Sequence, residues 1–157
     1  MAEWLKDVEP LTLKGQIAVP YSWWVGDTGS RFLMSLRDDR RILGTKCPSC
    51  GTVFVPPRRN CGRCFVDIEE WVDVAAEGVI EAHTIVHYAC PVQPVKPPFA
   101  YALIKLDGAD VGFLHLITRD LDKIQNGLRV RAKFKEERTG SILDIDSFEL
   151  IEAPVEG

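Results

Sequence analysis

The second half of the chain alternates hydrophobic and polar residues in short runs that predict β-strands. Within residues 78–88, Glu81, His83 and His87 share one face of this alternation, and the opposite face carries Ile80, Ala82, Thr84, Val86 and Tyr88. Further runs follow at 99–106, 111–117, 128–136 and 142–151, separated by turn residues. Residues 120–126, closed by Gly127, predict a short helix. Five strands with a helix between the third and the fourth predict an OB-fold, a small Greek-key barrel.

The first 40 residues begin with no clear period, and Pro10 and Pro20 interrupt any long helix. We expect loose structure up to Pro20. After it, the hydrophobic spacing becomes that of one helix face, with Gly26 and Gly29 as weak points, and involves Trp23, Val25, Phe32, Leu33 and Leu36. We predict a short helix over 31–38 with Ser30 as its N-cap, ending near Asp39.

Three aromatic residues stand close together just before this predicted helix. A small arm cannot easily bury such a cluster, so it is a candidate contact with a partner chain. The alternative is that the rings fold back onto the arm's own domain, because tryptophan is usually buried. The residues are Tyr21, Trp23 and Trp24.

Four of the five cysteines form two Cys-x-x-Cys pairs that are ten residues apart. The two-residue gap lets both sulfurs of a pair face one ion, and Gly51 and Gly62 allow the tight backbone of a zinc knuckle. A closed tetrahedral site leaves no position for a substrate, so we predict a structural metal site held by Cys47, Cys50, Cys61 and Cys64. Zinc is preferred over a rubredoxin-like iron. A thioredoxin-type redox motif is the weaker alternative, since it needs only one Cys-x-x-Cys pair and this sequence has two.

Charge divides the chain into three parts. Residues 1–40 carry five basic and six acidic side chains, residues 41–72 five and three, and residues 73–157 nine and fourteen, which gives the net charge of −4. We therefore predict a mainly β protein with an N-terminal arm and short helix at 1–40, a four-cysteine zinc ribbon at 41–72, and an OB-fold domain at 73–157. The net charge argues against a protein that binds nucleic acid over its whole surface.

The sequence has no run that approaches the roughly 18 to 20 apolar residues of a membrane span. Its start also lacks the basic and then apolar pattern of a secretory signal. We therefore expect a cytoplasmic protein without membrane contact.

Two groups of basic residues are candidate contacts for phosphates, for an acidic partner or for a nucleic acid strand. Strand alternation places one group on a single face of 128–136, namely Arg129, Arg131, Lys133 and Lys135. The ribbon supplies the other group, Arg58, Arg59 and Arg63. For the strand group the alternative is a solvated face whose charges discourage edge-to-edge pairing.

We predict no catalytic residue in this chain. Cys90 lies in a proline-rich loop at 88–98, where no glycine-rich turn or helix start in the sequence would activate it. His83 and His87 are four residues apart on one strand, about 13 Å, which is too far to share a metal. His115 sits in an apolar strand. The loop itself forms a stiff apolar flap that we expect to face an acyl chain or a partner subunit.

These elements resemble the family of small bacterial and archaeal proteins that join a rubredoxin-like zinc ribbon to an OB-fold and accompany acyl-CoA enzymes of the thiolase superfamily. The resemblance covers about residues 20–150 and rests on Cys47-x-x-Cys50-Gly51, Phe54-Val55-Pro56-Pro57-Arg58, Cys61-x-x-Cys64, Trp71-x-x-Val74, Gly78-Val79-Ile80, Pro98-Phe99-Ala100-Tyr101 and Gly127-x-x-Val130. It implies a non-catalytic subunit in a hetero-oligomer with a larger thiolase-family, aldolase-like or acyl-CoA synthase subunit. It further implies that a coenzyme A thioester is a shared ligand and that the complex makes or cleaves carbon-carbon bonds in aromatic or lipid degradation.

A different class of function remains open, that of a single-stranded nucleic-acid-binding module, because zinc ribbons and OB-folds both serve in such proteins. The net charge of −4 and the inward-facing aromatic residues of the predicted strands argue against it. A third interpretation is an electron carrier with iron in the four-cysteine site.

Overall fold

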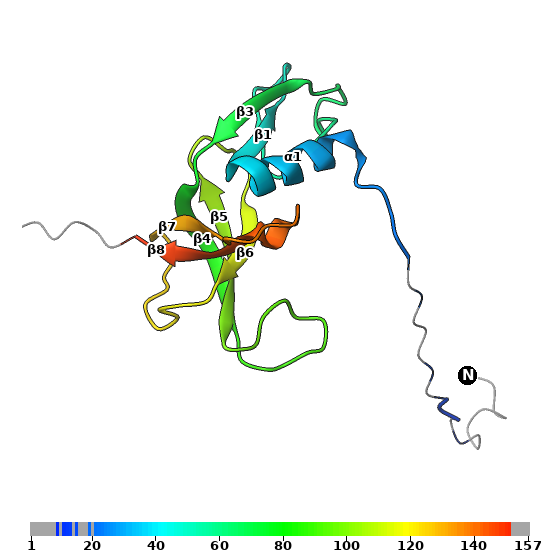
Figure 1. Cartoon of the computed structure of the whole chain (residues 1–157), viewed down its shortest axis with the longest axis vertical. Coiled ribbons are helices and arrows are strands. Elements are labelled where there is room, and N and C mark those ends of the chain that lie inside the picture. Colours follow the sequence, from blue (N-terminus) through cyan, green and yellow to red (C-terminus); the bar gives the residue numbers. More distant parts are fainter. Residues whose placement is uncertain (1–8, 10, 14, 16–18, 20, 152–157) are drawn as a thin grey trace, which may run out of the picture.

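The computed structural model describes residues 9, 11–13, 15, 19 and 21–151, and it contains one helix, a three-stranded sheet and a closed five-stranded barrel. The three-stranded sheet has the order β2-β1-β3 and the barrel the order β4-β5-β6-β8-β7. Figure 1 shows the three-stranded sheet above the barrel, α1 beside both, and residues 21–25 leading away from the first turn of α1. The mainly β fold with a ribbon and an OB-like barrel is thus confirmed. The loose structure expected up to Pro20 falls largely outside the described residues.

Helix α1 spans Gly26–Asp39, so it ends where the sequence predicts but begins earlier than residue 31. The predicted N-cap is wrong: Ser30 lies inside the helix, and Val25 precedes it without a side-chain cap. Phe32 and Leu36 are buried, as their helical spacing predicts, and both lie within the part of the helix that the sequence indicated. Arg40, at φ 56°, closes the helix by donating its backbone N–H to the Ser35 carbonyl.

The three-stranded sheet consists of β1 (Ile42–Lys46), β2 (Val53–Phe54) and β3 (Glu70–Val74), and β1 pairs antiparallel with both neighbours. The hydrophobic run Val53-Phe54-Val55 predicts β2, whereas β1 and β3 have no such prediction. Thr45, buried in the middle of β1, donates its hydroxyl to the Arg58 carbonyl at 3.0 Å and accepts the Arg58 N–H at 2.9 Å. This residue therefore ties the Pro-Pro-Arg segment to the sheet.

The barrel is formed by β4 (Glu77–Val86), β5 (Phe99–Leu106), β6 (Phe113–Ile117), β7 (Arg129–Phe134) and β8 (Ile145–Leu150). Pairing of β4 with β7 closes it, with Gly78 opposite Val130. A Cβ on Gly78 would lie 2.3 Å from the Lys105 carbonyl oxygen, so only glycine fits this close approach of β4 to β5. The core includes fully buried side chains from every barrel strand, among them Ile80, Ile104, Phe113, Val130 and Phe148.

Three expectations for the barrel are wrong. A bulge between Ile80 and Ala82 shifts the alternation of β4, so Ala82 and Thr84 are exposed and His83 turns to the half-buried side. Residues 120–126 form turns instead of a helix, because Asp120 adopts a left-handed φ of 51°. A 3-10 helix, η2 (Ile142–Asp144), precedes β8 at a place where a strand was expected.

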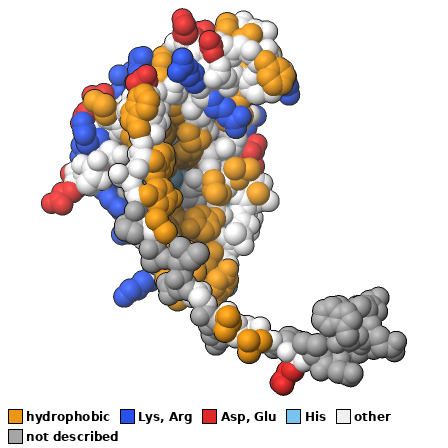
Figure 2. Space-filling view, turned by 90° about the vertical axis from the view of Figure 1, so that its right-hand side faces the viewer, with side chains coloured by type: hydrophobic (Ala, Val, Ile, Leu, Met, Phe, Trp, Pro, Cys, Tyr) orange, Lys and Arg blue, Asp and Glu red, His pale blue; other side chains and the backbone are white. Residues whose placement is uncertain are grey.

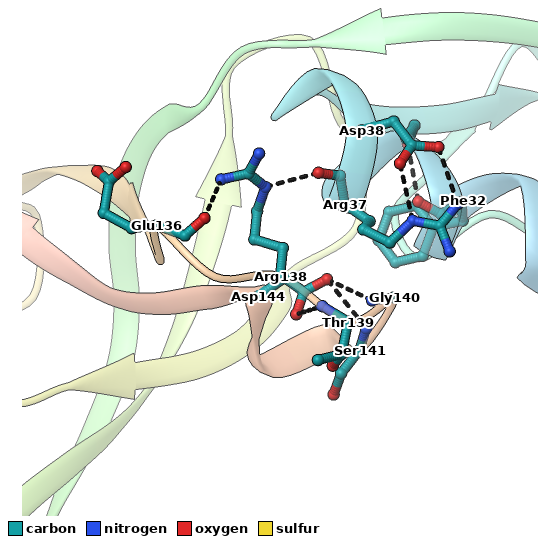
Figure 3. A network of polar contacts seen from close by, with 10 residues as sticks. Phe32, Arg37, Asp38, Glu136, Arg138, Thr139, Gly140, Ser141 and Asp144 are labelled. Carbon is teal, nitrogen blue, oxygen red and sulfur yellow. Dashed lines mark hydrogen bonds and ion pairs between the residues drawn. The ribbon is translucent and has the colours of Figure 1, made fainter.

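A polar network joins α1 to the barrel (Figure 3). The Arg138 guanidinium donates to the Arg37 carbonyl at 2.6 Å and to the Lys135 carbonyl at 2.7 Å. Burial raises the pKa of Asp144, but backbone N–H groups of Thr139, Ser141 and Gly140 outweigh it and hold that pKa below its usual value. Since these contacts hold the end of α1 on the 135–144 segment, the helix and the barrel form one unit.

No helix of the described residues is both long and apolar enough to cross a membrane.

Candidate metal centre and the surface around it

Each Cys-x-x-Cys pair lies on a tight knuckle at one end of the three-stranded sheet. In the first knuckle Gly51 donates its N–H to the Cys47 carbonyl at 2.9 Å, and in the second Phe65 donates to the Cys61 carbonyl at 2.9 Å. The residue after the second cysteine is left-handed in both, with φ 73° at Gly51 and 55° at Phe65. The sequence suggested Gly62 for this role, but the left-handed residue of the second knuckle is Phe65. Because left-handed positions are usually occupied by glycine, the sequence gives no sign that Phe65 adopts this conformation.

The four predicted ligands come together. Their Sγ atoms all lie within 4.8 Å of one another, and those of Cys50 and Cys61 are 3.8 Å apart. A tetrahedral ion with Zn–S bonds of about 2.3 Å requires sulfurs roughly 3.8 Å apart, so the cluster fits a single zinc ion. Cys47 and Cys61 are buried, whereas Cys50 is exposed at the surface.

Neighbouring thiols of the cluster affect the pKa values of Cys50 and Cys64. Hydrogen bonds from the side chain and backbone of Thr52 lower the pKa of Cys50 to about 6. The Ser49 side chain lowers the pKa of Cys64, but the sulfur of Cys50 and the other thiols raise it more, to about 11. Four sulfurs this close cannot all ionise without a positive charge between them. Binding of a divalent ion would therefore release protons from this cluster.

The sulfurs rest on a small apolar cluster that includes Phe54, Ile68 and Val111. Val111 belongs to the turn between β5 and β6, so this cluster connects the ribbon to the barrel. Asp110, in the same turn, accepts the Val53 N–H at 2.8 Å and donates its own N–H to the Val53 carbonyl at 3.0 Å. Asp110 is not among the predicted site residues, and its place two residues after Asp107-Gly108 was the available signal.

An open groove of about 720 Å³ lies between the knuckles and the β5–β6 turn. Arg58 and Arg63 line it on the ribbon side, and Asp110 lines it on the barrel side. The Arg58 guanidinium lies over the Phe54 ring, 5.1 Å from its centroid. Arg59 is exposed beside the groove. Within the described part of the chain, none of these three arginines forms an ion pair, so their charges are available to an anion.

The predicted basic face of β7 has a different environment. Arg129 pairs with Asp107 at 2.6 Å, and Arg131 pairs with Glu77 at 2.7 Å. Lys133 pairs with Glu149 at 2.8 Å, while Lys135 is exposed. Hydrogen bonds from Arg129 lower the pKa of Asp107, which agrees with a formed ion pair. Acidic neighbours therefore offset three of the four charges, and a role for this face in phosphate binding stays a prediction.

The three predicted aromatic contacts all face solvent. Tyr21 is 80% exposed, Trp23 70% and Trp24 75%. Figure 2 shows hydrophobic side chains along the arm and on the body above it. The loop between β4 and β5 also extends away from the barrel, on the side opposite the ribbon (Figure 1), and exposes Tyr88, Cys90 and Val92.

Matches to two domain families cover adjoining parts of the chain. The rubredoxin-like zinc ribbon domain of ChsH2 matches residues 34–70, and the C-terminal OB-fold domain of ChsH2 matches residues 71–135. A DUF35 domain-containing scaffold protein of Methanocaldococcus jannaschii is 25% identical over 95 residues, which cover 60% of this chain and 67% of that protein.

Two solved structures share the fold. A DUF35 protein of unknown function from Sulfolobus solfataricus matches with a TM-score of 0.56 and 29% identity over 69% of this chain and 77% of that one. A chain of the Ltp2-ChsH2(DUF35) aldolase matches with a TM-score of 0.58 and 20% identity over 80% of this chain and 93% of that one. The two domain matches together span about two thirds of the sequence. The chain therefore belongs to the ChsH2-type family, in which a rubredoxin-like zinc ribbon is followed by an OB-fold domain.

Proposed function

We propose that this chain is a non-catalytic accessory subunit of a thiolase-superfamily acyl-CoA enzyme that makes or cleaves carbon-carbon bonds. The observation that carries the proposal is a closed four-sulfur centre beside an open groove with unpaired arginines. Four thiolates fill the shell of a tetrahedral ion, so the metal stabilises a surface and binds no substrate. The relatives agree with this role, since one is called a scaffold protein and another is part of an aldolase complex.

Cys47, Cys50, Cys61 and Cys64 would hold the zinc ion. The ion supplies charge that lets all four thiolates ionise together, and it supplies folding free energy to a ribbon with a very small apolar cluster. The second knuckle then positions Arg63 along the groove, and Thr45 holds the backbone of Arg58 there. We expect this arrangement in the cytoplasm, where thiols stay reduced and available to a metal.

The groove is our proposed contact for the phosphates of coenzyme A. A guanidinium binds a phosphate through two parallel hydrogen bonds, and Arg58 is oriented for this by its contact with the Phe54 ring. The volume of about 720 Å³ lies within the usual range of small-molecule sites. The groove opens to solvent, so the acyl end of the ligand would continue into the catalytic subunit, which supplies the reacting groups.

Affinity purification of the tagged full-length chain from its source cells, followed by a sizing column and mass spectrometry, tests the proposal. We expect a thiolase-family subunit in fixed stoichiometry. The captured complex should then be assayed with several acyl-CoA substrates, including an aromatic one. The reason for the aromatic substrate is that the small subunit of a benzoylsuccinyl-CoA thiolase is one candidate identity within the family that this sequence resembles. A chain that elutes alone, or that carries nucleic acid released by salt, would contradict the proposal and favour a nucleic-acid-binding module.

A further inference from the structure

The segment directly before α1 exposes a run of aromatic side chains to solvent. Tyr21, Trp23 and Trp24 are each at least 70% exposed within four residues, and Ser22 between them is exposed as well. We call residues 21–24 the aromatic segment. Scattered single apolar residues need no explanation, but a contiguous aromatic run marks a contact with another molecule.

The base of the aromatic segment is fixed. It leads into α1, whose Phe32 and Leu36 are buried against the sheet and whose last turn is held by Arg138. The segment therefore leaves the body from a defined place, as Figure 1 shows. An anchor on a rigid base loses less conformational entropy on binding than one on a long flexible linker.

In the described part of the chain, the groove that runs along α1 begins close to the aromatic segment, since Asp27 lines it. The groove along α1 contains two apolar side chains, Met34 and Leu43, but charged side chains surround them, namely Asp27, Arg31, Asp38, Asp39 and Arg41. Burying two indole rings against these groups would remove the charges from water without compensation. A second copy of the chain would present the same charged groove, so self-association through this segment is disfavoured too.

We propose that the aromatic segment is the main anchor for the catalytic subunit and inserts into an apolar groove on it. This inference rests on the proposed function and adds the surface that makes the contact. A lipid surface is less suitable, because the segment carries no basic residue, Asp27 follows it, and the chain has a net charge of −4.

The area of the aromatic segment is large enough for this role. Each buried Tyr or Trp contributes about 150–250 Å², so three contribute roughly 450–750 Å². A standard interface needs about 800 Å² from each partner. Tryptophan and tyrosine are also the residues in which interface binding energy concentrates. The segment would thus supply more than half of one partner's share of a standard interface from four residues.

The test measures the affinity of the purified full-length chain for the subunit captured in the experiment above. In the first variant, Tyr21→Ser, Trp23→Ser and Trp24→Ser are combined. In the second, the same positions become Phe, which keeps the apolar rings. Leu114→Ser, an exposed apolar residue of β6, is the matched surface control. Zinc content and circular dichroism confirm that every variant is folded.

We expect the serine variant to bind on the order of 100-fold more weakly. The phenylalanine variant should stay within about tenfold of the parent, and the Leu114 variant within about twofold. Hydrogen exchange at 21–24 should slow only in the complex. Equal affinity of the serine variant and the parent would overturn the anchor while the proposed function stands. Capture of no acyl-CoA enzyme by the parent would overturn both.

Two further outcomes would also overturn the anchor. One is a parent dimer that the serine substitutions convert to a monomer, since the occupant would then be a second copy. The other is binding of the parent, and not of the serine variant, to vesicles of phosphatidylcholine and phosphatidylglycerol.

Discussion

Two basic regions of this molecule look alike in the sequence and differ in their surroundings. The ribbon arginines, Arg58, Arg59 and Arg63, form no ion pair among the described residues, whereas Arg129 and Arg131 on β7 face Asp107 and Glu77. An ion pair on the surface adds little stability, but it offsets the charge that an incoming phosphate would meet. Counting cations along a strand therefore overestimates its capacity to bind an anion. That capacity depends on the acidic side chains of the neighbouring strands, which offset the positive charge.

The largest expected effect comes from removing a ligand of the metal site that holds the ribbon together. Cys47→Ser takes away a buried ligand, so the ribbon should lose its metal and unfold together with its groove. Metal analysis should show about one zinc per parent chain and almost none in the variant. Thermal unfolding should show the ribbon transition lost. Cys90→Ser, at an exposed cysteine outside the cluster, is the control and should change neither. Normal metal content in the Cys47 variant would contradict the assignment.

The second prediction compares the two basic regions directly. Arg58→Gln combined with Arg63→Gln should weaken binding of acyl-CoA by the complex about tenfold to 100-fold, because charge-assisted hydrogen bonds to phosphate are lost. Arg129→Gln combined with Arg131→Gln should change it less than twofold. Isothermal titration at two salt concentrations measures both, and the salt dependence should fall only in the ribbon variant. A larger effect from the β7 variant would reverse the comparison.

The sequence predicted the metal site well because its signal is local. Ligand type, spacing and order fix a four-cysteine cluster, and the structure brings the four sulfurs together. The barrel strands were also predicted, since alternation is local as well. The bulge after Ile80 and the left-handed Asp120 could not be predicted, because they depend on contacts with other strands. The pairing of Arg129 with Asp107 joins β7 to the end of β5, and no local pattern reveals it.

The third prediction concerns the pH at which the fold that carries both regions loses stability. His115 is buried between Phe113 and Phe148, its Nε2 donates to the Ile142 carbonyl at 3.2 Å, and its Nδ1 has no hydrogen-bond partner among the described residues. Burial lowers the pKa of His115, and this effect outweighs the hydrogen bond to Ile142 and the nearby Asp146 carboxylate, which raise it. The Lys135 charge lowers it further.

The sign of the effect follows from these shifts. The unfolded chain binds a proton at His115 near pH 6.5, while the folded barrel resists it until a lower pH. Stability from this residue is therefore complete above pH 6.5 and decreases as the pH falls through 6.5 toward the lowered pKa. Urea unfolding at pH 5.5 and 7.5 should show the parent less stable at the lower pH. In His115→Phe this difference should shrink. An unchanged pH difference in the variant would exclude His115 as its source.

The smallest expected effect comes from a substitution that makes the basic face of β7 resemble the ribbon arginines. Glu77→Gln removes the carboxylate that pairs with Arg131 and also lies 3.3 Å from Arg129. Because these are surface pairs, the melting temperature should change little. Arg129 keeps its pair with Asp107, so the freed Arg131 guanidinium should give β7 a weak, salt-sensitive affinity for inorganic polyphosphate that the parent lacks. Fluorescence titration can detect it, with Glu136→Gln, an exposed acid paired to Arg40, as the control. If the Glu77 variant binds no polyphosphate, then charge offset alone does not distinguish the two regions. The shape of the ribbon groove, with Arg58 over the Phe54 ring, would then carry the difference.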